Sequence, residues 1–320
     1  MKAIRIHEFG GTEVLKLEDA SMPVPAADEI LVKIFASGVN PVDAAIRQGG
    51  NDVLRPFLKL PLILGCDAAG IVEAIGTEVT SFKKGDEVFG CPKFPGNGSY
   101  AEYVAAKASQ FALKPESLSF NEAAAVPLTA LVAWAGLFEL GNLQAGQRVL
   151  IQGASGGVGT FAVQLAKAKS ASVIATASAG NLEFLRQIGA DEVIDYKTHQ
   201  IEDLLHGIDL VFDASPIRDN EHRLKSISVI RDRGTYVSVN VDFPFDEKVA
   251  QALAQRHITG EMVAGQNHEH LAEIAALIDE GKVKVFVSKV YPLAEAAQAQ
   301  QEVATFHVRG KIVLEVQKEK

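Results

Sequence analysis

Cysteine is scarce in this sequence: Cys66 and Cys91 are the only two among 320 residues, and they form no C-x-x-C pair. Their scarcity argues against a disulfide scaffold and against a zinc site made of clustered cysteines. Basic residues are outnumbered by acidic ones, which gives a net charge of −9, and no extended basic run occurs. We therefore expect neither a nucleic acid nor an anionic membrane surface as a partner.

Long apolar segments are also missing. The first residues, MKAIR, do not lead into the apolar core of a secretory signal, and we expect no stretch long enough to cross a bilayer. A cytoplasmic protein is the default expectation. With 48% hydrophobic and 22% charged residues, the chain can bury a sizeable core, and its length favours about two domains.

The first part of the chain, up to about residue 125, is rich in β-strand patterns. Apolar runs bounded by glycine or acidic residues predict strands over 29–36, 70–76 and 85–90. Prolines punctuate the segments between these strands. A partly closed antiparallel sheet fits this pattern.

From about residue 121 the pattern changes to helices that alternate with strands. Helices are expected at 123–140, 181–188, 201–205 and 222–230, and strands at 148–152, 172–177, 192–195, 208–214, 235–239 and 257–263. This alternation indicates a parallel, doubly wound sheet, whose ligand lies beyond the carboxyl ends of the strands. The tail after residue 265, with helices at 269–279 and 293–304 and strands at 283–291 and 311–316, is expected to rejoin the β-rich part.

The most informative stretch is Arg148–Gly159, where an apolar run ends in a glycine-dense turn before an amphipathic segment. Strand, tight turn and helix in this order predict a dinucleotide-binding crossover, because free N–H groups at the helix start bind phosphate. The usual pattern is G-x-G-x-x-G, and here alanine takes the place of the first glycine. The predicted phosphate cradle consists of Ala154, Ser155, Gly156, Gly157, Val158 and Gly159. The alternative is an ordinary strand-to-helix turn in a parallel sheet.

The end of the next strand predicts which dinucleotide is bound. NAD-binding units place a carboxylate there for the ribose 2′-hydroxyl, but no Asp or Glu occurs between Gly159 and Glu183. A 2′-phosphate is therefore permitted, Ser178 and Asn181 can donate hydrogen bonds to it, and Lys197 could add charge. NADP(H) is favoured over NAD for this reason. The alternative for Ser178 is a cap on the helix that follows.

At this point the chain resembles the medium-chain dehydrogenase/reductase family, in its zinc-independent quinone oxidoreductase branch. The resemblance covers essentially the whole chain. It is carried by four segments besides the glycine turn: SGVNPVD at 37–43, GCDAAG at 65–70, GSYAEY at 98–103 and RGKIVL at 309–314. It implies a GroES-like catalytic domain of residues 1–124 plus 265–320 and a Rossmann-type dinucleotide-binding domain of residues 125–264.

The resemblance alone implies further cofactor contacts. Tyr196 would flank the adenosine phosphate, and the tail residues Gly310 and Lys311 would close over the cofactor. Residues that end strands beside the nicotinamide and its ribose would be Ala214, Ser215, Val239 and Asn240. Relatives carry a threonine that faces the nicotinamide where this chain has Val132, and Thr129 could substitute from one turn earlier. The alternatives are an exposed loop at Tyr196, a simple turn at Gly310, and a hydrogen bond from Thr129 within its own helix.

Zinc is not expected. Zinc-dependent relatives carry a cysteine ligand where this chain has Asn40 and a histidine ligand where it has Cys66, and the four-cysteine lobe of those relatives has no counterpart here. Asp43 or Asp67 beside Cys66 could supply some ligands, but Asn40 is a poor zinc ligand. A zinc alcohol dehydrogenase is therefore kept only as an alternative.

Without a metal, the predicted reaction is hydride transfer to an acceptor that is already activated, such as a quinone or an enone. The developing oxyanion needs a donor, for which Asn40 is the first candidate and Tyr100 the second. Asp43 is expected to orient Asn40 or a water rather than act as an acid, because no group that would raise its pKa is visible in the sequence. The alternative is that Asn40 and Asp43 only hold the loop beside Pro41 in place.

The predicted function is thus an NADPH-dependent reductase of a small apolar acceptor. Many quinone-reducing relatives have an aromatic residue where this chain has Ile46, so a 2-alkenal or enone reductase remains an alternative. A second alternative is a non-catalytic NADPH-binding sensor or structural protein. Because the strand at 257–263 would lie at the sheet edge, a homodimer through that edge is expected.

Overall fold

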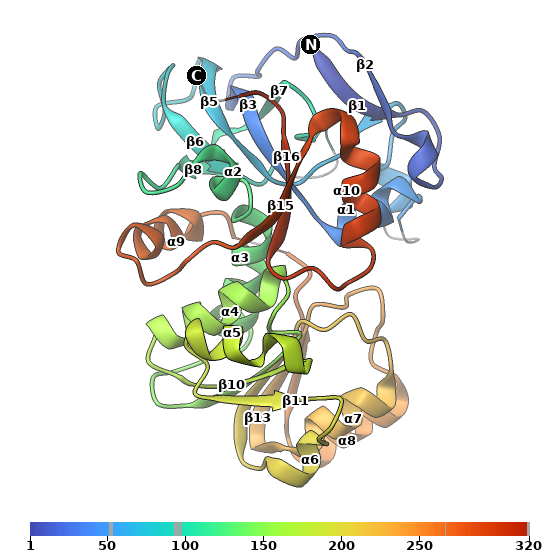
Figure 1. Cartoon of the computed structure of the whole chain (residues 1–320), viewed down its shortest axis with the longest axis vertical. Helices are drawn as coiled ribbons and strands as arrows, with labels where there is room; N and C mark the ends of the chain where they lie inside the picture. Colours follow the sequence, from blue (N-terminus) through green and yellow to red (C-terminus); the bar gives the residue numbers. More distant parts are fainter. Residues whose placement is uncertain (51–53, 93–95, 97, 266, 319–320) are drawn as a thin grey trace. The chain divides into compact units, whose positions relative to one another are not determined.

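The computed structural model describes residues 1–50, 54–92, 96, 98–265 and 267–318 of the chain. Its Cα positions fall into two compact units. The β-rich unit comprises 1–128, 268–280 and 285–320, and the nucleotide-type unit comprises 129–267 and 281–284. Figure 1 shows the elements of both. The sequence puts the boundaries at 124/125 and 264/265, within a few residues of these.

Strands dominate the β-rich unit, as predicted for this part of the chain. Its strands are β1 (Lys2–Ile6), β2 (Lys16–Asp19), β3 (Glu29–Val39), β4 (Leu62–Ile63), β5 (Ala68–Ile75), β6 (Glu87–Gly90), β7 (Tyr103–Lys107), β8 (Phe111–Leu113), β15 (Val287–Pro292) and β16 (Lys311–Glu315). Its helices are α1 (Pro41–Arg47), α2 (Phe120–Ala123), α9 (His270–Asp279) and α10 (Ala296–Val303).

A seven-stranded sheet organises this unit, in the order β15-β16-β3-β5-β6-β8 with β7 also paired to β3. The tail returns as predicted, because β16 runs antiparallel to β3 with Ile312 opposite Val39 and Leu314 opposite Ser37. Figure 1 shows the red tail strand entering the blue and cyan unit. This register brings residue 311 to the end of β3, where Asn40 begins the next element.

The segment around Pro41, for which a loop was considered, forms helix α1 instead. Pro41 occupies the first turn of α1, where a missing N–H does no harm. Asn40 precedes it in an extended conformation as the N-cap, and Asp43 at the third position accepts the Asn40 backbone N–H. Strand β3 therefore passes directly into a short capped helix.

The nucleotide-type unit alternates strands and helices. Its strands are β9 (Arg148–Gln152), β10 (Ser172–Ala177), β11 (Glu192–Asp195), β12 (Ile208–Asp213), β13 (Ile230–Ser238) and β14 (Thr259–Met262). Its helices are α4 (Gly157–Ala168), α5 (Leu182–Gln187), α6 (Ile201–Leu204), α7 (Asn220–Ser228) and α8 (Glu247–Gln255), and α3 (Pro127–Trp134) leads into it.

These six strands form one parallel sheet in the order β11-β10-β9-β12-β13-β14. The strand order changes direction between β9 and β12, which is where a doubly wound sheet binds its ligand. Strand β9 is apolar and fully buried at Val149, Leu150 and Ile151, as expected for a central parallel strand. The predicted fold class is therefore confirmed.

The expectation that no stretch is long enough to cross a bilayer is wrong in its literal form. The stretch Phe120–Glu139, which runs through α2, α3 and a π-helical turn, is long and apolar enough to cross a membrane by length and composition. However, 83% of its most apolar window is buried inside the protein. This is how a core helix of a globular protein behaves, and the stretch is weak support for a membrane span.

Candidate active site

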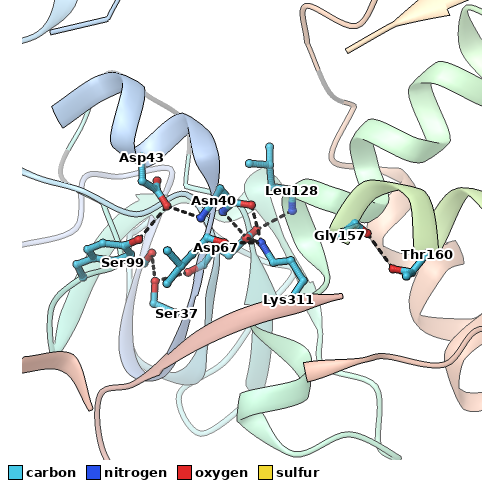
Figure 2. Close-up of polar contacts among 11 residues, drawn as sticks. Ser37, Asn40, Asp43, Asp67, Ser99, Leu128, Gly157, Thr160 and Lys311 are labelled. Carbon is cyan, nitrogen blue, oxygen red and sulfur yellow. Dashed lines mark hydrogen bonds and ion pairs between the residues drawn. The ribbon is translucent and has the colours of Figure 1, made fainter. Parts of the chain in front are cut away.

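The β-rich unit gathers buried polar side chains around Asn40, where β3 ends. The carboxamide of Asn40 donates from Nδ2 to Asp67 Oδ2 at 2.8 Å, and its Oδ1 accepts from Lys311 Nζ at 2.5 Å. All three residues are at most 4% exposed. Figure 2 shows these contacts converging on Asp67. An ammonium group only donates and a carboxylate only accepts, so this chemistry fixes which end of the Asn40 amide faces which partner.

Asp43 and Tyr100, the other two predicted catalytic residues, lie in the same cluster. One oxygen of Asp43, Oδ2, accepts the Asn40 backbone N–H at 2.8 Å and the Tyr100 hydroxyl at 2.9 Å. Both side chains are fully buried. Burial raises the pKa of the Tyr100 hydroxyl well above its usual range, and the nearby Asp43 carboxylate adds to this rise. In this structure the Tyr100 hydroxyl therefore donates its hydrogen bond to Asp43.

The expectation that nothing raises the Asp43 pKa is wrong. Burial raises the pKa of Asp43 from 3.8 to about 6, although the hydrogen bonds from Asn40 and Tyr100 partly oppose it. The sequence could not reveal this, because the largest cause is removal from water, to which the charge of Asp67 adds a smaller rise.

This shift predicts a stability effect of Asp43→Asn. A carboxyl whose folded pKa is raised stabilises the fold only while it is protonated, and stability falls as pH rises from 3.8 to about 6. The loss amounts to about 3 kcal/mol. We expect the difference in melting temperature between Asp43→Asn and the wild type to change in favour of the variant across this window. Above the window the difference should stay constant. Thermal unfolding over pH measures it.

Asp86→Asn is the matched control. The pKa of Asp86 is lowered, first by the Lys83 backbone N–H, so this variant should lose stability relative to the wild type as pH rises. If the melting temperatures of Asp43→Asn and the wild type follow parallel curves over pH, the raised pKa of the buried Asp43 carboxyl is contradicted.

A small cavity lies next to this cluster. It is lined by Ile46, Ile63, Leu64, Gly65, Cys66, Pro92, Gly96 and Gly98. None of these described lining residues is aromatic, and the buried Ile46 contributes an aliphatic wall. Burial, reinforced by the Asp43 charge, raises the pKa of the Cys66 thiol well above its usual range, so Cys66 behaves as a small apolar side chain.

The donor set does not fit a catalytic zinc ion. Within the described ranges, no three histidine, cysteine, aspartate or glutamate side chains are grouped so that they could hold a metal. The one oxygen that Asn40 could offer accepts a hydrogen bond from Lys311. Zinc sites need at least three protein ligands, and this cluster contains a lysine cation instead.

Sequence reasoning missed part of this cluster. Asp67 entered it only as a possible metal ligand, and Ser37 and Ser99 were not considered. The Ser37 hydroxyl donates to the Asp67 backbone carbonyl at 2.8 Å and lies 2.6 Å from the Ser99 hydroxyl. All three residues fall inside the segments that carry the family resemblance, which is the signal that could have found them.

In the nucleotide-type unit, the predicted phosphate cradle forms the turn between β9 and α4. Gly156 is the N-cap of α4, and the first helical hydrogen bond runs from Thr160 N–H to the Gly156 carbonyl. The N–H groups of the preceding turn of helix thus have no partner within α4. Gly159 is required for close approach, because a Cβ there would lie 2.3 Å from the Gly153 carbonyl oxygen. The residues fit a pyrophosphate group at the helix start.

Ser178 and Tyr196 follow neighbouring strands, since Ala177 pairs with Asp195 in the parallel ladder. The Tyr196 backbone N–H donates to the Ala177 carbonyl, and the Tyr196 side chain is 49% exposed. The Ser178 side chain makes no capping bond to the 3₁₀ turn Ala179–Asn181. The capping alternative for Ser178 is therefore not adopted.

The other predicted cofactor residues of this unit lie after β12 and β13. The Ser215 hydroxyl donates to Asp213 at 2.6 Å, and the Val239 N–H donates to the Asp213 carbonyl. Asn240 Nδ2 donates to the carbonyls of Ser215 and Ile217, which ties the two loops together. Ala214 packs against the glycine turn, because a Cβ on Gly153 would meet its carbonyl oxygen at 2.6 Å.

Thr129 and the tail residues complete the set. Thr129 is buried in α3 at 5% exposure. Gly310 has φ +70° and leads into β16, while the Lys311 side chain turns into the Asn40 cluster. The structure therefore unites Asn40, Asp43, Tyr100 and Lys311 within the β-rich unit, and it gathers the cradle and the two loop pairs at one end of the parallel sheet.

Known proteins match both units. Residues 26–116 match the alcohol dehydrogenase GroES-like domain, and residues 188–314 match the zinc-binding dehydrogenase family. Quinone oxidoreductase of Mus musculus is 35% identical over 326 residues, covering 97% of this chain and 96% of that protein. The chloroplastic NADPH-dependent alkenal/one oxidoreductase of Arabidopsis thaliana is 35% identical over 328 residues, covering 98% of this chain and 79% of the relative.

A solved structure agrees with these relatives. The crystal structure of Escherichia coli quinone oxidoreductase complexed with NADPH aligns with a TM-score of 0.87 at 30% identity, covering 99% of this chain and 100% of that one. The matches in sequence and in fold confirm the resemblance stated above. The chain belongs to the medium-chain dehydrogenase/reductase family of oxidoreductases, in its quinone oxidoreductase group.

Proposed function

We propose that this chain is an NADPH-dependent reductase that passes a hydride to a quinone or a similar conjugated acceptor without zinc. The observation that carries the proposal is the Asn40 carboxamide, held between a lysine and an aspartate at the position where zinc-dependent relatives have a metal ligand. A fixed amide donor suits an acceptor whose oxygen gains negative charge. It does not suit the ionisation of an alcohol, for which a metal is the usual Lewis acid.

The nucleotide-type unit supplies the residues for the cofactor. The N–H groups at the start of α4 would bind the pyrophosphate, and Gly156 and Gly157 would let it approach the backbone. The loops at Ala214–Ser215 and Val239–Asn240 would flank the nicotinamide end, and Thr129 would face it. When bound, the reduced nicotinamide would supply the hydride.

Side chains of the β-rich unit would bind the acceptor and stabilise the charge that develops on it. Asn40 would donate an N–H to the oxygen of the acceptor as charge develops there. Asp43 holds the Asn40 backbone and Tyr100 through one carboxylate oxygen, so it orients the donor. Water would deliver the final proton. Ile46 and Cys66, which line the small cavity, would contact part of the carbon skeleton of the acceptor.

NADPH-oxidation assays with purified protein test this proposal. We expect turnover with a quinone, with a 2-alkenal, or with both, and stoichiometric zinc should be missing from elemental analysis. The aliphatic cavity wall at Ile46, with no aromatic residue among its described lining, favours the 2-alkenal or enone reductase as the second candidate. A higher kcat/KM for the alkenal than for every quinone would select it. No NADPH oxidation with any acceptor would refute both.

The preference for NADPH gives a separate prediction. Ser178→Asp places a carboxylate where the 2′-phosphate would lie, and we expect the KM for NADPH to rise about 100-fold through like-charge repulsion. The KM for NADH should change little, because its ribose offers a hydroxyl that a carboxylate accepts. Steady-state kinetics with both cofactors measure the ratio.

Arg186→Ala is the control for Ser178→Asp. Arg186 pairs with Glu183 at 3.5 Å on the exposed face of α5, so its loss should leave both KM values unchanged. Equal KM changes for NADPH and NADH in Ser178→Asp would count against a phosphate site at Ser178, Asn181 and Tyr196.

We further infer a homodimer through the edge strand. Strand β14 closes the six-stranded sheet on one side and pairs only with β13 within it. Its residues are exposed or partly exposed, which leaves the edge open to pairing.

A small apolar acceptor remains the expected partner, and a cytoplasmic location remains a prediction.

A further inference from the structure

Lys311 is a buried cation whose hydrogen-bonding capacity is used up inside the β-rich unit. Its ammonium group donates to Asn40 Oδ1 at 2.5 Å and to the Val39 carbonyl at 3.1 Å, and it lies 3.3 Å from Asp67 Oδ2. An ammonium group has three N–H donors, so each has an acceptor. The side chain is 4% exposed and that of Asp67 is fully buried. No donor of the Lys311 side chain is left for the cofactor, although the resemblance implies that Gly310 and Lys311 close over it.

We propose that Lys311 and Asp67 are positioning residues that lock the Asn40 carboxamide in one orientation, so that a single N–H remains for the acceptor. This inference rests on the proposed function, since it assigns the origin of the Asn40 donor. The Lys311 ammonium group can donate only to the amide oxygen of Asn40, and the Asp67 carboxylate can accept only from its amide N–H₂. The flipped amide would face a cation with its N–H₂ and a carboxylate with its oxygen, and both contacts would be lost.

Asp67 is itself held on every side. Its Oδ1 accepts the Leu128 backbone N–H at 2.6 Å, while Oδ2 faces Asn40 and Lys311. Its backbone carbonyl accepts from Ser37, whose hydroxyl contacts Ser99. Figure 2 shows these contacts around the Asp67 carboxylate. Because neither oxygen can rotate away without losing a partner, Asp67 is a rigid support for the Asn40 amide.

The arrangement leaves a defined donor. Asn40 Nδ2 carries two hydrogens, and one of them is donated to Asp67. Within the part of the chain that the structure describes, the second hydrogen has no recorded protein acceptor. The lysine at Oδ1 also polarises the amide and makes this second N–H a stronger donor. The pair thus fixes both the direction and the strength of the donor offered to the acceptor oxygen.

Lys311→Met tests the proposal. We expect kcat to fall about 10- to 100-fold through loss of orientation, while the Kd for NADPH, measured by fluorescence titration, stays unchanged. Lys289→Met is the matched control, since Lys289 lies on the neighbouring strand, half-exposed, and pairs with Glu302 instead. Its kcat should equal that of the wild type. A raised Kd for NADPH with unchanged kcat in Lys311→Met would overturn the proposal in favour of cofactor closure.

The double variant Lys311→Met with Asp67→Asn separates positioning from stability. Lys311→Met alone leaves a buried carboxylate without its cation, so its melting temperature should drop. Removing both charges should restore the melting temperature but not kcat, because an asparagine at 67 can face either end of the Asn40 amide. Recovery of kcat together with the melting temperature would show a merely structural pair and would overturn the proposal.

A spectroscopic readout keeps the proposal independent of turnover. The side-chain amide signals of Asn40 can be assigned by comparison with Asn40→Ala and followed in ¹⁵N-labelled protein. Lys311→Met should shift this pair while other asparagine side chains stay in place, and Lys289→Met should shift none. If the wild type proves inactive, the proposed function fails, and these signals alone decide the orientation: an unshifted Asn40 pair overturns it.

Discussion

Asn40→Ala is expected to lower kcat about 100- to 1000-fold, as the loss of one oxyanion donor does in other enzymes. The alanine removes the side-chain amide that we propose as the donor to the acceptor oxygen. The Kd for NADPH should stay within about a factor of two, because the residues assigned to the cofactor in the nucleotide-type unit are untouched. Steady-state kinetics and fluorescence titration together measure this division.

Ser37→Ala is the control from the same cluster. It removes a buried hydrogen bond to Asp67 without touching a donor to the acceptor. We expect a loss of about 1 kcal/mol in stability and a kcat within a few-fold of the wild type. If Asn40→Ala keeps the wild-type kcat, the oxyanion role passes from Asn40 to another group, and the mechanism proposed above is wrong.

Gly159→Ala is the second large effect. Its Cβ would lie 2.3 Å from the Gly153 carbonyl oxygen and 2.5 Å from the Ala154 Cα, both backbone atoms that cannot move independently. The turn must shift, at a cost of about 1–3 kcal/mol in stability. A displaced turn no longer aims its N–H groups at one phosphate, so we expect NADPH affinity to fall at least about tenfold. Thermal unfolding and NADPH titration measure the two effects.

Gly156→Ala separates two causes of weaker NADPH binding: distortion of the turn, and a methyl group that occupies the proposed phosphate position. A Cβ at Gly156 meets only the Gly153 carbonyl oxygen, at an ordinary 3.4 Å, so the fold should keep its stability. The same methyl group would stand at the start of α4, where the pyrophosphate is proposed to lie, and NADPH affinity should fall about tenfold. Gly265→Ala, whose Cβ has open space, should change neither. Unchanged NADPH binding in Gly156→Ala would remove the cradle from the proposal.

The alternation of strands and helices was predictable because parallel strands are short apolar runs bounded by turns. The predicted strand over 172–177 coincides with β10, and 192–195 coincides with β11. Helix α8 was missed, and the short strands β1, β2, β4, β7 and β8 were not predicted at all. Short edge strands carry little periodicity. Helix α8 does carry helix signals in its sequence, because Asp246 caps it and most of its residues are strong helix formers.

The site was predictable only in part, for a physical reason. Asn40, Asp43 and Tyr100 came from motifs, and the structure brings them into one cluster. Lys311 was assigned to the cofactor, because nothing in a sequence tells which way a lysine on a returning strand will point. Its partners lie more than 240 residues earlier in the chain. The β3–β16 register brings Lys311 to the end of β3, and the pairing of β5 with β3 brings Asp67 to the same place.

That register also sets an order of assembly. Strand β16 follows every other strand and helix that the structure describes, yet it inserts between β3 and the edge strand β15 of a sheet begun near residue 29. A nascent chain halted before residue 311 could complete the parallel sheet but would leave Asp67 buried without its countercharge. Without residue 311 the Asn40 side-chain oxygen would lack the lysine that bonds to it, so the orientation of the Asn40 amide is settled only once β16 is in place.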